Sequence, residues 1–188
     1  MKDKYWIAFS AIEQIDSAFV QRLYNYFGDV EEAYNAGLND LEQIDGLSVR
    51  KAETFLRERD KINPDKALEE VQNRDIKFLA FEDEKYPKML KQISNPPAVL
   101  YYKGDIEACN FERTLAVVGS RRASYSAKEA VNKILSELKD TDICIVSGLA
   151  AGIDTAAHLA ALENNLKTIG VIASGFDYIY PSSNKYLY

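Results

Sequence analysis

The stretch "LAVVGSRRASYSAKEAVNKILSELKDTDICIVSGLAAGID", residues 115–154, decides the fold of this chain. Two short apolar runs, residues 115–118 and 143–146, flank a segment whose apolar residues recur at helical spacing, and a third run follows at residues 168–172. Apolar runs without alternation are typical of strands buried on both faces of a parallel sheet. The pattern therefore predicts an α/β fold, a Rossmann-like open parallel sheet with helices on both faces.

Three loops rich in glycine and serine follow these runs: "GSRRASYS" from residue 119, "SGLAAGID" from residue 147 and "SGFDYIYPSSN" from residue 174. In a parallel sheet such loops meet at the carboxyl edge of the strands, where ligands bind. Helix N-termini there present unpaired N–H groups, and Arg121 and Arg122 add positive charge. We expect a phosphate or carboxylate at this edge. The alternative is that the glycines only turn the chain and the serines only cap helices.

Several kinds of site are disfavoured by the residues that are present. The first loop has one glycine where a nicotinamide dinucleotide favours Gly-x-Gly-x-x-Gly, and no Gly-Lys-Ser/Thr sequence supports a Walker-type ATP site. No cofactor is expected. His158 lies four residues after Asp154, but no nucleophile-elbow sequence surrounds Ser147. We expect Asp154 to support the loop and His158 to form a hydrogen bond within the packed domain. We do not expect the chain to be an enzyme. One histidine without a carboxylate cluster leaves too few ligands for a metal.

The N-terminal part predicts a separate all-helical domain over residues 1–62, and a composition change near residue 63 opens a second domain over residues 63–188. Asp16 as a cap and Gly28 as a terminator predict a helix between them. Residues 40–59 predict a helix-hairpin-helix. Its turn has Ser48 where DNA-binding hairpins commonly have a second glycine, and Ser48 is also an ordinary N-cap. DNA contact and protein packing both stay open for this hairpin, although its mixed charges favour a solvated face.

The composition limits the cellular setting and the partners. The formal net charge of −6 means that any contact with a polyanion must be local. Cys109 and Cys144 have no metal-binding spacing and are expected to be reduced, without a disulfide. No stretch approaches the roughly 18 apolar residues of a membrane span, so we expect a cytoplasmic protein without membrane contact.

The motifs "LAVVGSRRAS", "IVSGLAAGIDTAAHLAAL" and "GFDYIYPSSN", with "YPKML" and "NPPAVLYYKG" before them, resemble the DNA-processing protein A (DprA, or Smf) family, which is associated with natural transformation. The resemblance covers residues 75–188, and residues 1–62 are similar to the family's SAM-like helix-hairpin-helix domain. It implies a protein without an established catalytic activity that binds single-stranded DNA and helps to load the RecA recombinase.

The same resemblance implies roles for single residues. Gly119, Ser120 and Arg121 would contact DNA phosphate, with Arg121 the principal cation, and Ser147 and Gly148 would form the neighbouring wall. Further DNA contacts are expected from Arg122, Tyr125 and Phe176. The motif residues that would support the pocket are Gly152, Asp154, His158, Gly175 and Asp177.

Members of the family continue with an Arg-Asn-Arg segment and a dimer surface, which we expect this chain to lack; homodimerisation is an expectation for the full-length family. Two other functions stay open. One is a nucleotide-binding or nucleoside-monophosphate-processing Rossmann-like protein, although the Pro-Gly-Gly-x-Gly-Thr loop of such hydrolases does not occur in the sequence. The other is a protein-interaction scaffold that acts through its acidic surface.

Overall fold

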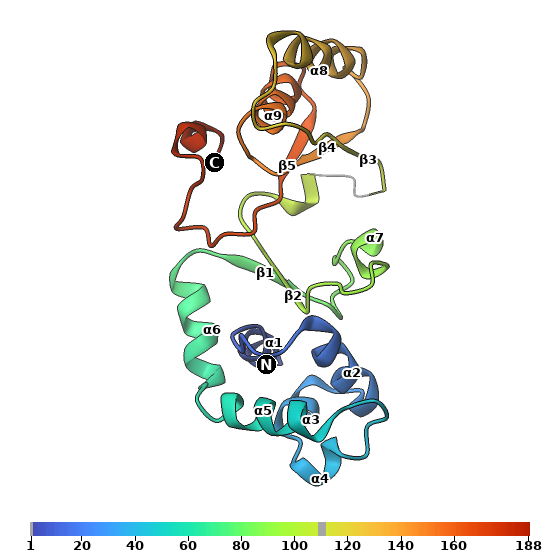
Figure 1. Ribbon diagram of the computed structural model, residues 1–188, viewed down its shortest axis with the longest axis vertical. Coiled ribbons are helices and arrows are strands. Elements are labelled where there is room, and N and C mark those ends of the chain that lie inside the picture. The colour runs from blue at the N-terminus through green and yellow to red at the C-terminus, as the bar shows by residue number, and fades with distance from the viewer. Residues whose placement is uncertain (1, 109–111) are drawn as a thin grey trace. The chain divides into compact units, whose positions relative to one another are not determined.

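The computed structural model describes residues 2–108 and 112–188, which form two compact units (Figure 1). Met1–Gly104 form the first, the helical unit, and Asp105–Tyr188 form the second, the sheet unit. The boundary between the two compact units, after Gly104, lies later in the chain than the composition change near residue 63. Cys109 lies outside the described residues.

The helices of the helical unit begin and end at local sequence signals. The predicted helix between Asp16 and Gly28 is confirmed as α2: the Asp16 carboxylate accepts a hydrogen bond from the Phe19 N–H at 2.8 Å, and Gly28 ends the helix with φ +69°. In the described residues, the helices that precede the first strand are α1 (Asp3–Ser10), α2 (Ser17–Phe27), α3 (Val30–Asn35), α4 (Leu38–Leu41), α5 (Val49–Arg59) and α6 (Pro64–Asn73).

The turn between α4 and α5 is closed by internal hydrogen bonds. The Ser48 hydroxyl caps α5 by accepting from the Lys51 N–H at 3.3 Å, and the Arg22 guanidinium donates to the carbonyl oxygens of Asp45 and Gly46. Charged side chains of this hairpin pair with carboxylates, as a mixed-charge face predicts. The ion pairs are Lys51–Asp16, Arg57–Glu58, Arg59–Asp60 and Lys61–Glu58.

A two-stranded antiparallel sheet of β1 (Lys77–Ala80) and β2 (Val99–Tyr102) completes the helical unit, with the short helix α7 (Lys88–Lys91) between the strands in the chain. Glu82, which follows β1, accepts hydrogen bonds from the Trp6 indole N–H at 2.8 Å and from the Tyr24 hydroxyl at 2.9 Å. Because one carboxylate binds both α1 and α2, this part of the chain packs with the preceding helices.

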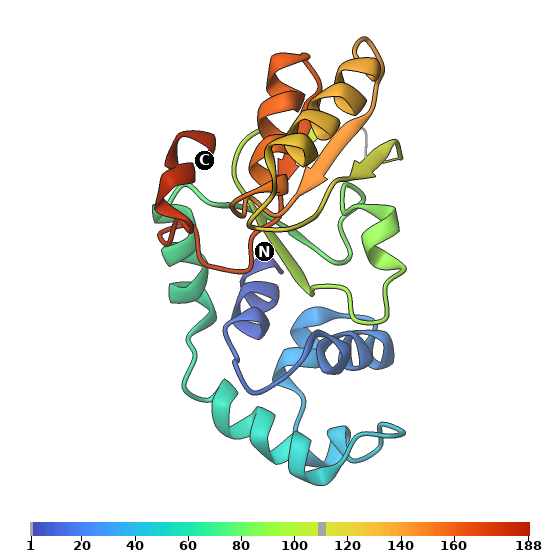
Figure 2. The same cartoon turned by 45° about the horizontal axis from the view of Figure 1, so that its top comes forward.

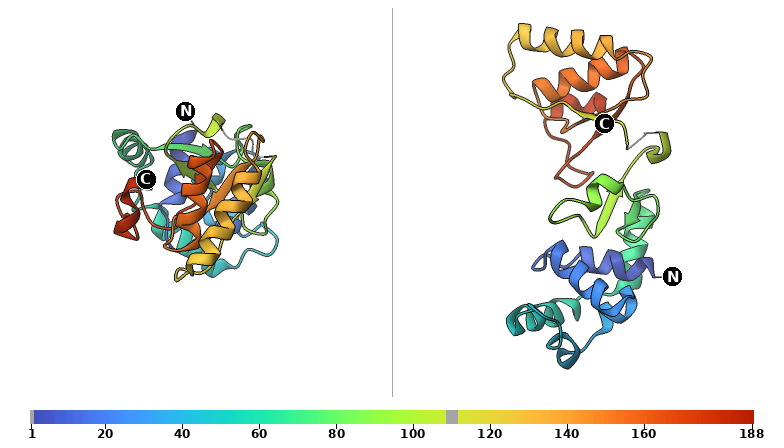
Figure 3. Two further views of the ribbon diagram at one scale, coloured as in Figure 1. Left: turned by 90° about the horizontal axis from the view of Figure 1, so that it is seen from above. Right: turned by 90° about the vertical axis from the view of Figure 1, so that its right-hand side faces the viewer.

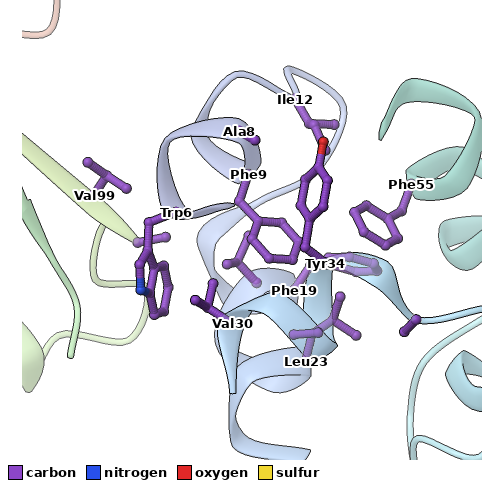
Figure 4. Close-up of a cluster of buried hydrophobic side chains, with 14 of the residues drawn as sticks. Trp6, Ala8, Phe9, Ile12, Phe19, Leu23, Val30, Tyr34, Phe55 and Val99 are labelled. Carbon is purple, nitrogen blue, oxygen red and sulfur yellow. The ribbon is translucent and has the colours of Figure 1, made fainter. Parts of the chain in front are cut away.

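An aromatic cluster forms the core of the helical unit (Figure 4). Phe55 of α5 is fully buried; its ring stacks on that of Phe9 with centroids 5.5 Å apart, and Tyr34 meets Phe9 edge-on at 5.1 Å. Burial raises the pKa of Tyr34 to about 12, because its phenolate would lose hydration. These rings join α1, α3 and α5.

The sheet unit has an alternating strand and helix order. Its sheet is parallel with strand order β3-β4-β5, in which Ala116 pairs with Val146 and Val146 with Ile169. The open parallel sheet of the Rossmann-like prediction is therefore confirmed. The elements are η1 (Ile106–Ala108), β3 (Thr114–Ala116), α8 (Tyr125–Glu137), β4 (Cys144–Ser147), α9 (Ile153–Glu163), β5 (Lys167–Gly170) and η2 (Ser182–Leu187), where η marks a 3-10 helix.

The two crossover helices lie side by side on one face of this sheet (Figures 2 and 3). Strands in sequential order with right-handed crossovers place successive helices on the same side, so the described part of the sheet carries both helices on one face, where the sequence predicts helices on both. Leu135 of α8, Ile145 of β4 and Ala157 of α9 are fully buried there. Among the described residues, no helix reaches the length and apolar character that crossing a bilayer requires.

We predict that Phe55→Ala lowers the free energy of unfolding of the helical unit by about 3–5 kcal/mol, because the lost ring leaves a cavity among three helices. Trp6 is the only tryptophan and is fully buried in the same core, so its fluorescence in a urea titration measures this change. Val49→Ala, on the same helix at a side chain 50% exposed, is the control and should stay within about 0.5 kcal/mol. Equal losses for the two variants would contradict the prediction.

Candidate functional site

The three glycine- and serine-rich loops follow three adjacent parallel strands and so begin at one edge of the sheet. The loop at 117–124 follows β3, the loop at 148–152 follows β4 and the loop at 171–181 follows β5. We call this the loop edge. It belongs wholly to the sheet unit.

The first loop presents two arginines to solvent. The side chains of Arg121 and Arg122 are exposed, and neither guanidinium forms an ion pair with any residue that the structure describes. The loop itself is fixed: the Ser120 hydroxyl accepts a hydrogen bond from the Arg122 N–H at 3.1 Å, and the Ser124 hydroxyl caps α8 by accepting from the Ala127 N–H at 3.2 Å. Positive charge is thus displayed on an ordered turn.

Direct backbone contact joins the first loop to the second. The Ser120 carbonyl oxygen accepts a hydrogen bond from the Ile153 N–H at 3.2 Å, at the first turn of α9. Gly152 has φ +89°, and a Cβ on it would lie 2.1 Å from that same oxygen. A Cβ on Gly119 would lie 2.7 Å from the Ile153 side chain. Only glycine lets these two loops approach so closely.

Asp154 braces the second loop from inside. Its buried carboxylate accepts hydrogen bonds from the Gly148 N–H at 3.1 Å and from the Ala150 N–H at 3.4 Å. The Thr155 hydroxyl donates to the Ala150 carbonyl oxygen at 2.8 Å. The first turn of α9 therefore holds the loop that precedes it through both N–H and C=O groups.

Asn184, in the last helical turn, holds the same loop from the other side. It is 3% exposed, and its side-chain N–H₂ donates to the Leu149 carbonyl oxygen at 2.8 Å and to the Thr155 hydroxyl at 2.8 Å. Leu149 has φ +56°, an unusual value for leucine that these contacts accompany. The sequence analysis missed Asn184 and Thr155 as site residues; the available signal was the asparagine that ends the "YPSSN" motif.

Two residues expected to contact phosphate have partners inside the unit. The Ser147 side chain is 3% exposed, and its hydroxyl donates to the Val117 carbonyl oxygen at 2.7 Å. The Gly148 N–H donates to Asp154. The Ser147 hydroxyl and the Gly148 N–H therefore serve contacts within the sheet unit. At the loop edge, the cationic side chains that the sequence analysis expected to contact phosphate are those of the first loop.

His158 is buried on α9 at 2% exposure. Its Nδ1 lies 2.8 Å from the Thr168 hydroxyl, which in turn donates to the Ile145 carbonyl oxygen at 3.1 Å. This chain of bonds assigns the proton of the neutral ring to Nδ1 and leaves Nε2 without a partner among the described residues. Burial lowers the pKa of His158, and the charge of Asp154 opposes that shift.

The third loop contains Gly175 and Asp177, which the sequence analysis expects to support the pocket. Both residues are exposed, and a Cβ on Gly175 would have no neighbour within 4 Å. The Gly175 carbonyl oxygen accepts a hydrogen bond from the Tyr178 N–H at 2.9 Å, which forms a turn. Residues 2–108 and 112–188 contain no group of three or more metal-ligating side chains.

A profile of the family described as DNA recombination-mediator protein A matches residues 77–188. The chain belongs to this family. The resemblance found in the sequence motifs is thereby confirmed.

Named relatives of the recombination-mediator family cover nearly all of the chain. Protein Smf from Synechocystis sp. is 34% identical over 98% of this chain and 47% of its own length. DNA processing protein DprA from Streptococcus pneumoniae is 41% identical over 80% of this chain and 51% of its own length. The chain spans about half the length of the curated relatives that it matches.

Two solved structures of the family are similar to this chain. The X-ray structure of DNA processing protein A from Streptococcus pneumoniae has a TM-score of 0.81 at 34% identity and covers 98% of this chain and 62% of its own. A structure that reports the single-stranded DNA binding mode of DNA processing protein A from Helicobacter pylori has a TM-score of 0.50 at 30% identity. It covers 59% of this chain and 49% of its own.

We predict that Gly152→Ala destabilises the sheet unit by more than about 1 kcal/mol, because the residue has positive φ and its new Cβ would collide with the Ser120 carbonyl oxygen. Hydrogen exchange of the Ile153 amide, which donates to that oxygen, measures the loss directly. Gly175→Ala, at a glycine with free space around it, is the matched control and should leave the exchange rate unchanged. Unchanged protection in Gly152→Ala would show that the two loops do not depend on this contact.

We also predict that the stability of the sheet unit falls as the pH drops below about 6.5. The pKa of His158 is lower in the folded chain than in the unfolded chain, so between the two pKa values the unfolded chain binds a proton that the folded chain does not. Lower pH therefore favours unfolding. In an NMR titration of untagged protein, the histidine ring-proton signals belong to His158 alone, because it is the only histidine, and their midpoint should lie below 6.5. His158→Gln should flatten the dependence of unfolding free energy on pH between about 7 and 5.5. A midpoint at or above 6.5 would contradict the assignment.

Proposed function

We propose that this chain binds single-stranded DNA at its loop edge and takes part in the processing of DNA during recombination. The observation that carries the proposal is the pair of exposed arginines, Arg121 and Arg122, on a turn that glycine contacts and serine hydroxyls hold in place. Arginine binds phosphate oxygens through bidentate hydrogen bonds, and phosphate contacts provide most of the affinity for nucleic acid.

Charge in the rest of the molecule supports this location. Many cations of the helical unit already pair with carboxylates, including Lys51, Arg57 and Lys61 of the hairpin region. A cation that is neutralised within the protein releases fewer counterions on binding DNA than a free one. Arg121 and Arg122 are therefore better placed than these paired hairpin cations to contact a phosphate backbone.

The family relationship supports the choice of ligand. Similarity to DNA processing proteins, and to a structure that reports a single-stranded DNA binding mode, favours a DNA strand over a free nucleotide. We extend the proposal to a cytoplasmic role in which the bound strand is handed to the RecA recombinase during natural transformation. Its support is the family resemblance of the motifs.

The hydrogen bonds of the loop edge support a binding role over a catalytic one. A hydrolytic site would need a nucleophile paired with a base. The Ser147 hydroxyl instead donates to a backbone carbonyl, and the His158 ring is bound to Thr168. Neither side chain is exposed to solvent, so neither is placed to reach a substrate.

We expect fluorescence anisotropy with labelled DNA to show preference for a single strand over a duplex, with affinity that falls as salt rises. Arg121→Ala should weaken single-strand binding regardless of sequence and lower the slope of log affinity against log salt by about 0.7, the value for one lost phosphate contact.

Arg50→Ala is the matched control, since Arg50 is an exposed arginine of the hairpin in the helical unit. It should leave affinity and slope unchanged. A loss with Arg50→Ala and none with Arg121→Ala would move the DNA site to the hairpin. Hydrolysis of a nucleoside monophosphate by the wild-type chain would favour an enzyme instead.

A further inference from the structure

The tyrosines of the sheet unit differ from those of the helical unit in exposure. All five tyrosines of the sheet unit have exposed side chains, with exposed fractions between 42% and 79%. They are Tyr125, Tyr178, Tyr180, Tyr186 and Tyr188. Of the seven tyrosines in the helical unit, only Tyr26 is exposed. Aromatic rings in the sheet unit are therefore displayed where those of the helical unit are packed.

The phenol groups differ in the same way. In the helical unit, tyrosine hydroxyls bind protein groups, among them Glu31 with Tyr5, Glu82 with Tyr24 and the Pro97 carbonyl with Tyr86. In the part of the sheet unit that the structure describes, none of the five tyrosine hydroxyls has a hydrogen bond to the protein. Packing within this unit therefore does not explain why these rings are present.

Their positions in the chain bring these tyrosines to the loop edge. Tyr125 is the first residue of α8, directly after the loop that carries Arg121 and Arg122. Tyr178 and Tyr180 lie on the loop that follows β5. Asn184 fastens the end of that segment to the loop that follows β4. Exposed rings thus border the same edge as the exposed arginines, on both outer strands.

One ligand matches both kinds of group. Arginine side chains form charge-assisted hydrogen bonds with phosphate oxygens. Exposed aromatic faces stack on other planar rings. A single strand of nucleic acid presents phosphates and unpaired base faces in alternation along its length, whereas a duplex keeps its base faces stacked inside. Stacking on an aromatic side chain is tolerant of sequence, because every base has a π-face.

We propose that Tyr178 and Tyr180, with Tyr125, form a stacking surface for the bases of a single strand whose phosphates lie at Arg121 and Arg122. The inference rests on the proposed function and adds to it the recognition of bases. It assigns the preference for single strands to exposed tyrosines and the salt dependence to arginines.

The test compares an oligothymidine with a strand of equal length that has abasic sites in place of all its bases. The abasic strand keeps every phosphate and offers nothing to stack on. The double variant Tyr178→Ala/Tyr180→Ala should bind the oligothymidine at least about tenfold more weakly than the wild-type chain. Its affinity for the abasic strand and its salt slope should match those of the wild type. That unchanged abasic-strand affinity excludes a folding defect of the alanine variant. Tyr178→Phe/Tyr180→Phe, which keeps the rings, should retain affinity for the oligothymidine.

Tyr26→Ala is the control for loss of an exposed tyrosine on the helical unit and should bind both strands normally. Wild-type affinity of the double alanine variant for oligothymidine, together with weak binding by Arg121→Ala, would overturn the stacking surface and leave the phosphate site standing. Equal weakening of both strands would also overturn it. No binding of any strand by the wild-type chain would overturn the proposed function as well. A lower sedimentation mass of the double variant, with DNA affinity unchanged, would assign the tyrosines to a contact with a second copy.

Discussion

The approach of Gly152 to the Ser120 carbonyl oxygen is the constraint on which the loop edge depends. Ser120 lies in the loop that carries Arg121 and Arg122, and Gly152 directly precedes α9, so this contact fixes the loop of exposed cations against the start of that helix. Asp154, Thr155 and Asn184 then satisfy the N–H and C=O groups of the loop between β4 and α9. Buried polar groups that are hydrogen-bonded favour one loop conformation, and this conformation sets the position of the arginines.

Binding and stability draw on different groups in this chain. Asp154, Asn184 and Ser147 hold the loop edge from buried positions, and Gly119 and Gly152 leave no space for a larger side chain. The arginines that we propose to bind a ligand, Arg121 and Arg122, are exposed. Ser147 illustrates the separation, since its hydroxyl looks suited to a phosphate but serves to connect β3 to β4. This hydrogen bond forms within the sheet unit and needs no ligand. A loop edge that is ordered before a ligand binds loses less entropy on binding.

The sequence was sufficient for the strand and helix order, the parallel sheet and the family, because apolar runs, caps and loop motifs are local signals. It did not reveal that Ser147 points inward. A strand that is apolar throughout has no polar and apolar alternation to show which residues point to which face of the sheet. The structure shows that Ser147, two residues after the buried Ile145, lies on the same face of β4 as Ile145. Asn184 and Glu82 were missed for another reason: each acts on residues far away in the chain, and pairing over such separations leaves no periodic pattern.

The 35-residue separation between Leu149 and Asn184 has a consequence for how the protein is made. Strands β3 and β4 and the arginine loop leave the ribosome before the asparagine that fastens the loop beyond β4. A nascent chain can therefore form the sheet and bury its helices while the loop edge is still loose. Contacts distant in sequence form late because closing a long loop costs entropy. The loop beyond β4 would then become fastened only after the strands and helices of this unit have formed.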